Sequence, residues 1–295
     1  MGLAFDRDCD RGNSKKILHK SRGYRVSRIK VCMQKLKNEG RKALIPYIVA
    51  GDPTPEFTVP MLHALVASGA DILEIGVPFS DPMAEGQVIQ LAHERALVHN
   101  VGLKDVLAMV GEFRQTDDKT PIVLMGYANP VSHMGYQLFA DRAAKAGVDG
   151  LLTVDLPPEE ASDLNEILKG VAIDSIFLIA PTTTEERIKS ISEMATGYLY
   201  YVSLKGVTGA GNLNVEAVRS RVDAIKLITD LPLTVGFGIK DVESATAISA
   251  LAEGVVVGSA LVGSIHELVQ RMEQKSAIEE SVKLISDMRE GIDQS

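Results

Sequence analysis

The sequence predicts an α/β fold in which eight parallel strands close into a barrel and a helix follows each strand, the (β/α)8 or TIM barrel. Eight apolar runs alternate strictly with eight helix-length segments. The runs are almost continuously apolar, which is typical of parallel strands covered on both faces. The length of 295 residues also fits, because such barrels occupy about 250 residues as one unit. The expected strands cover residues 43–51, 71–78, 121–128, 150–157, 174–181, 197–203, 231–238 and 253–259.

Helical segments are expected after each of these strands. They cover residues 55–68, 87–115, 134–146, 158–169, 184–195, 215–229, 241–252 and 260–273. The alternative fold is an open doubly wound sheet, which usually carries fewer strands and a glycine-rich turn after the first one. Here the first strand ends in Ala50-Gly51-Asp52-Pro53, which is no dinucleotide-binding fingerprint. Eight strand–helix pairs therefore favour the barrel.

The two ends of the chain extend beyond these pairs. Residues 1–25 mix charges without an apolar period, which predicts a disordered N-terminal extension before a single barrel domain at 26–295. From Val26 to Gly40 an amphipathic pattern predicts an extra N-terminal helix. A second amphipathic pattern, at 274–292, predicts one C-terminal helix.

Composition and charge exclude several classes of function. The 31 Lys and Arg against 39 Asp and Glu give a net charge of −8, whereas nucleic-acid binding needs a concentrated basic face. The longest uncharged apolar-rich stretch, 254–265, is far shorter than the roughly 18 residues of a transmembrane helix. Cys9 and Cys32 form no disulfide framework and no metal-ligand spacing. We therefore expect a cytoplasmic protein that binds neither nucleic acid, membrane nor metal.

Polar residues near the carboxyl ends of strands carry the chemistry in this fold. Glu74 lies inside the second apolar run, where an ionised carboxylate is costly. Burial raises the pKa of a Glu toward neutrality, which suits a general acid or base. The alternative for Glu74 is a structural carboxylate in a salt bridge beneath a helix. Asp155 raises the same question, and Tyr200 taken alone is more often a core aromatic.

Two loops and two glycine-rich strand ends complete the expected site. Loop 78–86 is long and carries two acids, and loop 204–212 contains three glycines, which suits a lid but also fits a long surface loop. Residues 236–238 (Gly-Phe-Gly) and 258–259 (Gly-Ser) follow the last two strands. Phosphate groups bind at these two places in the fold. We expect a phosphorylated substrate, with tight strand–helix packing as the alternative.

Six motifs, in order along the chain, resemble the tryptophan synthase alpha subunit family. The resemblance runs from about residue 27 to 272, and few other barrels share the run EIGVPFSDP within it. The motifs are IPYIVAGDP (45–53), EIGVPFSDPMAEG (74–86), MGYANP (125–130), YYVSLKGVTGA (200–210), GFGI (236–239) and VVVGSALV (255–262).

The resemblance implies a lyase of tryptophan biosynthesis that cleaves indole-3-glycerol phosphate to indole and glyceraldehyde 3-phosphate. It implies no metal or organic cofactor in this chain. It also implies a beta subunit that carries pyridoxal phosphate and joins the alpha subunit in an α2β2 heterotetramer. Such a retro-aldol cleavage needs indole C3 protonated, the indole N1–H polarised and the glycerol hydroxyl deprotonated.

The resemblance also assigns roles to single residues. Glu74 matches the proton-shuttling glutamate, Glu85 the second catalytic acid at the indole N–H, and Tyr200 the tyrosine beside the substrate glycerol. Among the substrate-binding residues, Thr208 matches the lid threonine that reaches the loop acid on closure. The other assignments are Tyr127, Leu152 and Phe237 to the indole pocket, Gly209, Gly238, Gly258 and Ser259 to phosphate binding, and Asp81, Pro82 and Asn129 to the beta-subunit interface.

The sequence departs from the family motif within one loop. The family has Pro-x-Ala-Asp-Gly-Pro where residues 82–87 read Pro-Met-Ala-Glu-Gly-Gln, so the second acid is Glu85 rather than Asp. Its extra methylene moves the carboxylate by about one C–C bond, and a misplacement of about 1 Å can cost on the order of 100-fold in rate. Two alternatives follow. One is a catalytically weakened subunit that acts mainly as an allosteric partner of the beta subunit, and the other is a different phosphate-binding TIM-barrel enzyme.

Overall fold

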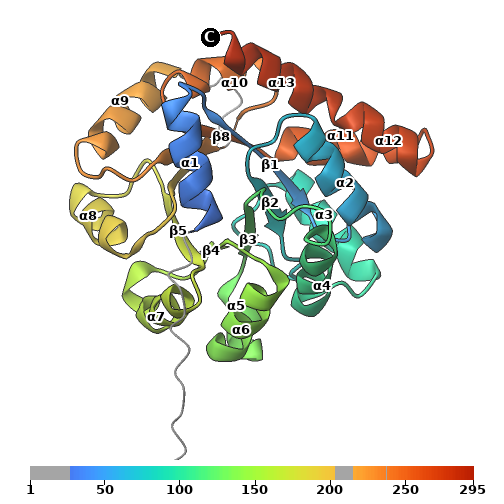
Figure 1. The fold of residues 1–295 in the computed structure, drawn as a ribbon, viewed down its shortest axis with the longest axis horizontal. Helices are drawn as coiled ribbons and strands as arrows, with labels where there is room; N and C mark the ends of the chain where they lie inside the picture. The colour runs from blue at the N-terminus through green and yellow to red at the C-terminus, as the bar shows by residue number, and fades with distance from the viewer. Residues whose placement is uncertain (1–26, 203–214, 237) are drawn as a thin grey trace, which may run out of the picture.

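The computed structural model describes residues 27–202, 215–236 and 238–295. Eight parallel strands form a closed barrel in chain order, and β8 pairs back onto β1 (Figure 1). The strands are β1 Ala43–Val49, β2 Leu73–Gly76, β3 Ile122–Gly126, β4 Gly150–Thr153, β5 Asp174–Ile179, β6 Leu199–Val202, β7 Leu233–Gly236 and β8 Gly254–Val257. This confirms the predicted fold class. The N-terminal extension expected at 1–25 lies outside the described residues.

Helices surround the barrel (Figure 1). They are α2 Pro55–Ala67, α3 Gln87–Val98, α4 Leu103–Phe113, α5 Ala128–Met134, α6 Tyr136–Ala146, α7 Ser162–Gly170, α8 Glu185–Met194, α9 Val215–Lys226, α10 Val242–Ser249 and α11 Ser259–Val269, with a short 3-10 helix at Pro158–Glu160. The single helix expected at 87–115 is wrong, because α3 and α4 are separate. Asn100 has a φ of 57°, which interrupts the helix, and Gly102 is the N-cap of α4.

The single C-terminal helix expected at 274–292 is also two helices, α12 Gln274–Ser281 and α13 Lys283–Asp293. The hydroxyl of Ser281 donates to the carbonyl of Ala277 at 2.7 Å, and a bond of this kind bends helices. The break lets α12 pack on α11 and α2 while α13 packs on α10. The pair therefore runs along the outside of the barrel (Figure 1).

Side chains of each strand alternate between the barrel interior and the layer beneath the helices. In β1, Tyr47 belongs to the interior cluster and Ile48 to the outer one. In β2, Leu73 and Ile75 pack in the outer cluster, which directs Glu74 between them into the interior. The strand β2 thus points the carboxyl group of Glu74 into the interior of the barrel.

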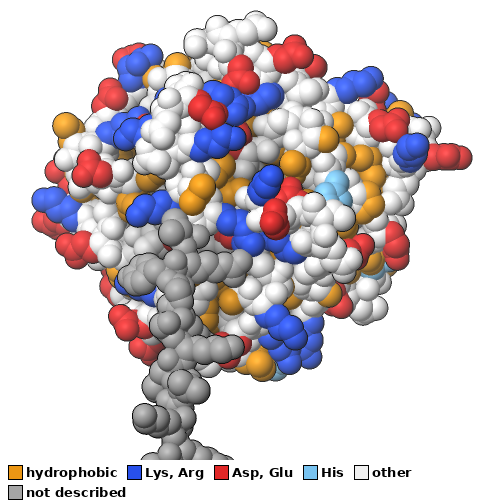
Figure 2. Space-filling view, viewed as in Figure 1, with side chains coloured by type: hydrophobic (Ala, Val, Ile, Leu, Met, Phe, Trp, Pro, Cys, Tyr) orange, Lys and Arg blue, Asp and Glu red, His pale blue; other side chains and the backbone are white. Residues whose placement is uncertain are grey.

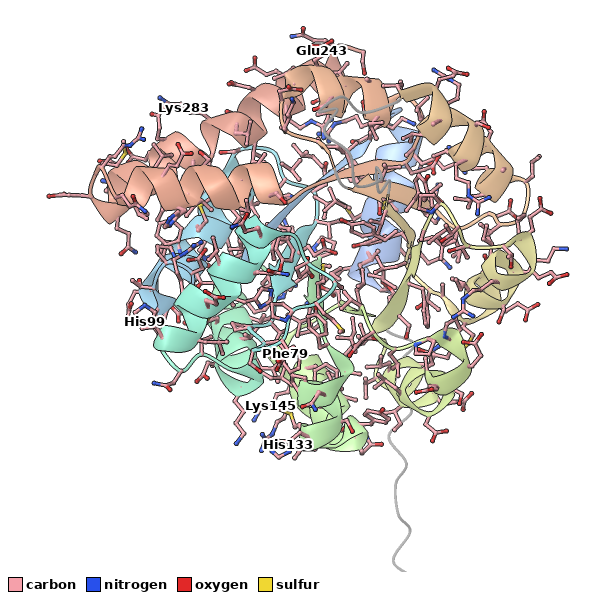
Figure 3. The ribbon with its side chains drawn as sticks, turned by 180° about the vertical axis from the view of Figure 1, so that it is seen from behind. Phe79, His99, His133, Lys145, Glu243 and Lys283 are labelled. Atoms are coloured by element: carbon pink, nitrogen blue, oxygen red, sulfur yellow. The ribbon has the colours of Figure 1, made fainter. Side chains whose placement is uncertain are left out.

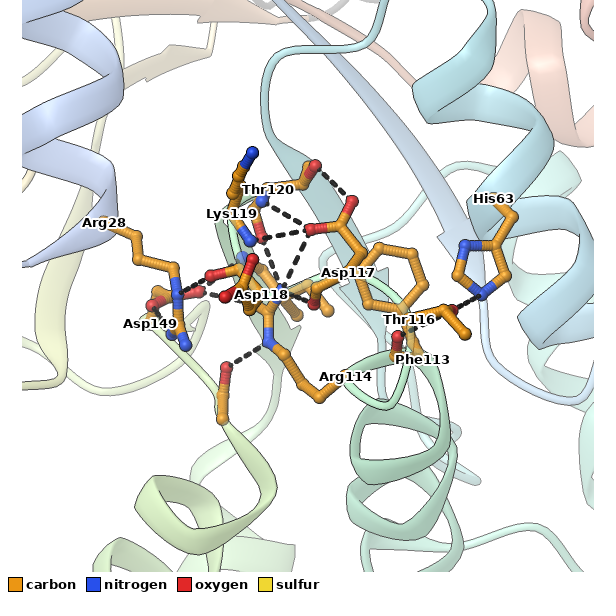
Figure 4. A network of polar contacts seen from close by, with 12 residues as sticks. Arg28, His63, Phe113, Arg114, Thr116, Asp117, Asp118, Lys119, Thr120 and Asp149 are labelled. Atoms are coloured by element: carbon orange, nitrogen blue, oxygen red, sulfur yellow. Dashed lines mark hydrogen bonds and ion pairs between the residues drawn. The ribbon is translucent and has the colours of Figure 1, made fainter.

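The helix α1 (Arg28–Asn38) closes the amino-terminal end of the barrel. Ile29 and Met33 of this helix are buried in the same cluster as the interior strand residues. Arg28 donates to one oxygen of Asp149 at 2.7 Å, and Arg114 donates to the other oxygen at 2.7 Å (Figure 4). This network ties α1 to the residue just before β4 and confirms the extra N-terminal helix.

The surface that carries α1 has mixed charge. Lys and Arg side chains are interspersed with Asp and Glu across this face (Figure 2). In the described part of the chain, no helix combines the length and the apolar character needed to cross a membrane.

Candidate active site

Glu74 is the polar group at the centre of the site. It is 1% exposed, and neither carboxyl oxygen has a hydrogen-bond partner among the described residues. Burial, together with the nearby charge of Glu85, raises its pKa to about 8. A carboxyl group with this pKa carries its proton at neutral pH and has both oxygens free to meet a ligand.

Glu85 lies in the acid loop, which we define as residues 77–86 between β2 and α3. Its N–H donates to the carbonyl of Pro82 at 3.1 Å, and its own carbonyl accepts a bond from Gln90 Nε2 at 2.8 Å. The side chain is partly buried, and burial raises its pKa to about 7. Glu74 and Glu85 therefore both change protonation state close to neutral pH.

The charge of Glu85 reaches several groups at the mouth of the barrel. Burial is the main cause of the raised pKa values of Tyr47, Tyr127 and Tyr200, and Glu85 contributes to each of them. Three hydroxyl groups from β1, β6 and the end of β3 thus lie within electrostatic reach of one carboxylate. All three hydroxyl groups therefore stay protonated at neutral pH.

Tyr127 follows β3 and supports the acid loop. Its hydroxyl oxygen accepts a bond from the N–H of Ala84 at 3.0 Å. Its ring stacks on Phe79 with the ring centroids 4.8 Å apart. Phe79 lies between the α3 and α5 segments on the side of the barrel opposite α1 (Figure 3). Tyr127 therefore contacts both halves of the acid loop.

Two tyrosines lie across the ends of neighbouring strands. Tyr200 is buried on β6, and a Cβ atom added to Gly236 of β7 would lie 2.0 Å from its hydroxyl oxygen. Tyr47 on β1 has the same relation to Gly76 of β2, with a corresponding distance of 2.2 Å. Only glycine leaves room for either hydroxyl. Gly76 and Gly236 thus determine where these two hydroxyl groups lie.

Three of the four residues expected to bind phosphate lie after the last two strands. Gly238 follows β7 with a φ of 80°, Gly258 follows β8, and Ser259 is the first residue of α11. Because β7 and β8 are neighbours in the barrel, these residues share one side of its mouth. The amino-terminal N–H groups of α11 supply the partial positive charge that attracts an anion.

The other predicted residues divide between the interior and the rim. Leu152 is buried in the interior cluster on β4. Asp81 and Asn129 are exposed and Pro82 is partly exposed on the segments that follow β2 and β3, at the same end as Glu85. Thr208, Gly209 and Phe237 lie outside the described residues.

Sequence reasoning missed some polar residues of this region. It described 43–51 as an almost continuously apolar run and did not single out Tyr47, which falls on the interior face with Ile45 and Val49. Strand alternation could have shown this. His93 on α3 is also buried in this region, and its Nδ1 accepts the N–H of Phe79 at 3.1 Å.

The sequence left open whether Asp155 is a catalytic or a structural carboxylate. It is exposed in the turn after β4 and accepts the N–H of Ala128 at 2.8 Å. Ala128 is the first residue of α5, so this carboxylate satisfies a free N–H group at a helix start. Its role is structural.

In the described ranges, no three His, Cys, Asp or Glu side chains are grouped so that they could hold a metal ion. The closed barrel places two carboxyl groups that titrate near neutrality at the carboxyl end of β2, with glycine-rich turns beyond β7 and β8. Fold and site together define an enzyme of the TIM-barrel class that works by general acid–base catalysis.

Comparison with known proteins identifies the family. A family model described as Tryptophan synthase alpha chain matches residues 33–292. The tryptophan synthase alpha chain of Thioalkalivibrio sulfidiphilus is 57% identical over 268 residues, which are 91% of this chain and 100% of the relative. That of Marinobacter nauticus is 55% identical over 269 residues, 91% of this chain and 98% of the relative.

A solved structure agrees with these matches. The crystal structure of tryptophan synthase subunit alpha from Legionella pneumophila has a TM-score of 0.86 and 48% sequence identity, and the match covers 92% of this chain and 100% of that one. The chain belongs to the tryptophan synthase alpha chain family. It is a lyase of tryptophan biosynthesis that cleaves indole-3-glycerol phosphate, which confirms the expectation from its motifs. The alternatives, a mainly allosteric subunit or another phosphate-binding barrel, are not favoured.

Proposed function

We propose that Glu74 and Glu85 perform the acid–base steps of this lyase reaction. The observation that carries the proposal is the pair itself. A buried carboxyl group without a partner among the described residues lies within electrostatic reach of a second carboxyl group on the adjoining loop. Near neutral pH the first is protonated and the second is partly ionised, so the pair offers one proton donor and one acceptor.

Glu74 is proposed to transfer protons at the bond that breaks. In its acid form it protonates C3 of the indole ring. The glycerol hydroxyl then loses its proton, its electrons form the aldehyde, and the C–C bond electrons return to the indole. The proton from the hydroxyl restores the acid form of Glu74, so the step needs no external proton. Ionised Glu85 accepts a hydrogen bond from the indole N1–H and stabilises the positive charge on the protonated ring.

The remaining residues are proposed to orient the substrate. Tyr200 lies beside the glycerol part, and Tyr127, Leu152 and Phe237 line the indole pocket. Gly209, Gly238, Gly258 and Ser259 hold the phosphate, with N–H groups at the start of α11 facing the anion. Thr208 belongs to the loop that covers the bound substrate.

The same family membership supports the proposed context of the reaction. We propose that the chain needs no metal or organic cofactor for its own step and that pyridoxal phosphate belongs to the beta subunit. Asp81, Pro82 and Asn129 are proposed to contact that partner in an α2β2 heterotetramer. The enzyme is proposed to work in the cytoplasm.

Indole release from indole-3-glycerol phosphate tests this proposal, measured with and without a purified tryptophan synthase beta subunit. We expect turnover that rises when the beta subunit is added. A plot of kcat/KM against pH should have its maximum between about 7 and 8, the pKa values of Glu85 and Glu74. Absence of turnover under both conditions, with the beta reaction still stimulated, would contradict the catalytic assignment.

Glu85→Asp and Glu85→Gln sharpen the same experiment. Glu85→Gln removes the charge and should lower kcat by roughly 100-fold or more. Glu85→Asp keeps the charge on a shorter side chain, and activation of the beta subunit should be nearly unchanged in both variants. A rise in kcat for Glu85→Asp would show that the extra methylene slows the natural enzyme, and a fall would show that the site is built for Glu.

A further inference from the structure

We propose that His93 is a positioning residue that holds the acid loop and thereby Glu85. The inference deepens the proposed function and rests on the assignment of Glu85 as the second acid. His93 lies on α3, about two turns after Glu85, and its hydrogen bond with Phe79 places it against the acid loop. It contacts neither reacting carboxyl group through any hydrogen bond that we observe, so it would act through the loop.

One face of α3 supports the acid loop through two side chains. Gln90 and His93 are three residues apart, which places them on the same side of the helix. Gln90 Nε2 donates to the carbonyl oxygens of Glu85 at 2.8 Å and Pro82 at 3.4 Å. His93 Nδ1 accepts the N–H of Phe79 at 3.1 Å. The helix thus holds the end of the loop with a donor and its beginning with an acceptor.

The contact at Phe79 is connected to Glu85 through Tyr127. The backbone N–H of Phe79 is held by its hydrogen bond to His93, and the ring of Phe79 stacks on the ring of Tyr127. The hydroxyl of Tyr127 accepts the N–H of Ala84, the residue next to Glu85. Loss of the bond at Phe79 would free the stacked ring and, through Tyr127, loosen the backbone beside the carboxyl group.

The protonation state of His93 fits an acceptor role. The imidazole is 1% exposed, and burial lowers its pKa to about 4, so it is neutral at physiological pH. Because Nδ1 accepts a backbone N–H, the ring proton is on Nε2. That nitrogen has no hydrogen-bond partner among the described residues.

An apolar side chain would fill this space without the unpaired Nε2, but it would leave the N–H of Phe79 without its acceptor. What the imidazole supplies, and an apolar side chain would not, is the acceptor for Phe79. The role of His93 is therefore separable from packing by two substitutions. His93→Asn places a carbonyl oxygen at the position of Nδ1, and His93→Leu fills space without an acceptor.

The experiment compares these two variants in the presence of the beta subunit. We measure kcat and KM for indole release, and amide hydrogen exchange at Phe79 and Ala84. For His93→Leu we expect kcat to fall at least 10-fold with little change in KM, and the two amides to exchange faster. His93→Asn should restore kcat to within about 3-fold of the unmodified enzyme and should restore slow exchange.

His63→Leu is the matched control. His63 on α2 also makes a hydrogen bond, between its Nε2 and the hydroxyl of Thr116, which are 3.1 Å apart, and its ring stacks on Phe113. It lies beside the network at the amino-terminal end of the barrel (Figure 4). We expect His63→Leu to leave kcat and the exchange of the acid loop unchanged.

Unchanged kcat in His93→Leu would overturn the inference, as would an equal loss in His93→Leu and His93→Asn. If His93→Leu does not fold, exchange in the unmodified enzyme decides, because a Phe79 amide as fast as an exposed loop amide would also overturn it. Glu85→Gln is measured alongside. Loss of turnover in Glu85→Gln with normal turnover in His93→Leu refutes the inference alone, whereas normal turnover in Glu85→Gln refutes the proposed function and the inference with it.

Discussion

Two buried carboxyl groups at opposite ends of the barrel have opposite surroundings. Asp149, at the amino-terminal end, is 5% exposed and is bonded to Arg28 and Arg114, each at 2.7 Å, and to the N–H of Ile122 at 2.9 Å. Glu74, on the second strand, is 1% exposed, and neither of its oxygens has a hydrogen-bond partner among the described residues. The difference indicates which end of the barrel holds the fold together and which end is kept for chemistry.

The two carboxyl groups also differ in their effect on the stability of the fold. Removal of one partner from a buried ion pair typically costs about 3–5 kcal/mol, because the other charge is left unpaired. A buried carboxyl group without a partner avoids its desolvation cost by keeping its proton, and its pKa rises. Glu74 therefore lowers the stability of the fold at neutral pH while it supplies a proton donor, a trade-off known at active sites.

The largest expected effect is on catalysis at the active-site end. Glu74→Gln keeps the size of the side chain but cannot transfer a proton, so kcat for indole release should fall by roughly 1,000-fold, within the range for general acid–base groups. The melting temperature should not fall, since no ion pair is lost. Turnover close to that of the unmodified enzyme would contradict the role of Glu74.

The counterpart at the other end should affect stability and spare catalysis. Asp149→Asn removes the charge between Arg28 and Arg114 and should lower the free energy of unfolding by about 3 kcal/mol. Denaturant unfolding measures this loss, and kcat per folded molecule should stay within about 2-fold. A large fall in kcat at full folding would mean that the two ends are coupled.

The barrel could be predicted from the sequence because each strand and helix has a local pattern and this pattern repeats eight times. Eight apolar runs and their helices could be counted directly, and Glu74 stood out as a charge inside such a run. Two helix breaks were missed. One lies at Asn100, which has a positive φ, and the other lies beside Ser281, whose hydroxyl donates to the carbonyl of Ala277. The periodicity of apolar residues does not show such features of single residues.

The contacts within the site were less accessible than the positions of its residues. Strand alternation could have placed Tyr47 inside the barrel. The bond from Phe79 to His93 joins a loop to a helix face whose rotation depends on packing. The motifs assigned roles to residues such as Glu85 and Tyr127, but the bond that joins Tyr127 to Ala84 depends on the relative position of two loops.

The difference between the two ends should also depend on pH. Glu74 in the unfolded chain ionises near pH 4.5, whereas in the folded chain it keeps its proton up to about pH 8. The contribution of the protonated Glu74 to the free energy of unfolding is therefore fully present below pH 4.5 and is lost as the pH rises to about 8. The stability of Glu74→Gln relative to the unmodified enzyme should increase over this range by up to about 1.4 kcal/mol per pH unit. Parallel stability curves would show that Glu74 is not protonated in the fold.

The smallest expected effect concerns the space around Tyr200. In Gly236→Ala the new methyl group would lie 2.0 Å from the Tyr200 hydroxyl oxygen, so the tyrosine must shift. We expect kcat to fall about 10-fold. The tyrosine is proposed to orient the substrate, and a displacement of about 1 Å can cost up to about 100-fold in rate. Steady-state kinetics of indole release checks this.

Gly111→Ala is the matched control for that change. Gly111 lies in α4, and an added Cβ atom would meet nothing within 4 Å. Alanine there should raise the free energy of unfolding by about 0.5–1 kcal/mol, because glycine is the poorer helix former, and should leave kcat unchanged. If Gly236→Ala behaved like Gly111→Ala, the hydroxyl of Tyr200 would have no part in orienting the substrate. The active-site end of the barrel would then depend on its two carboxyl groups alone.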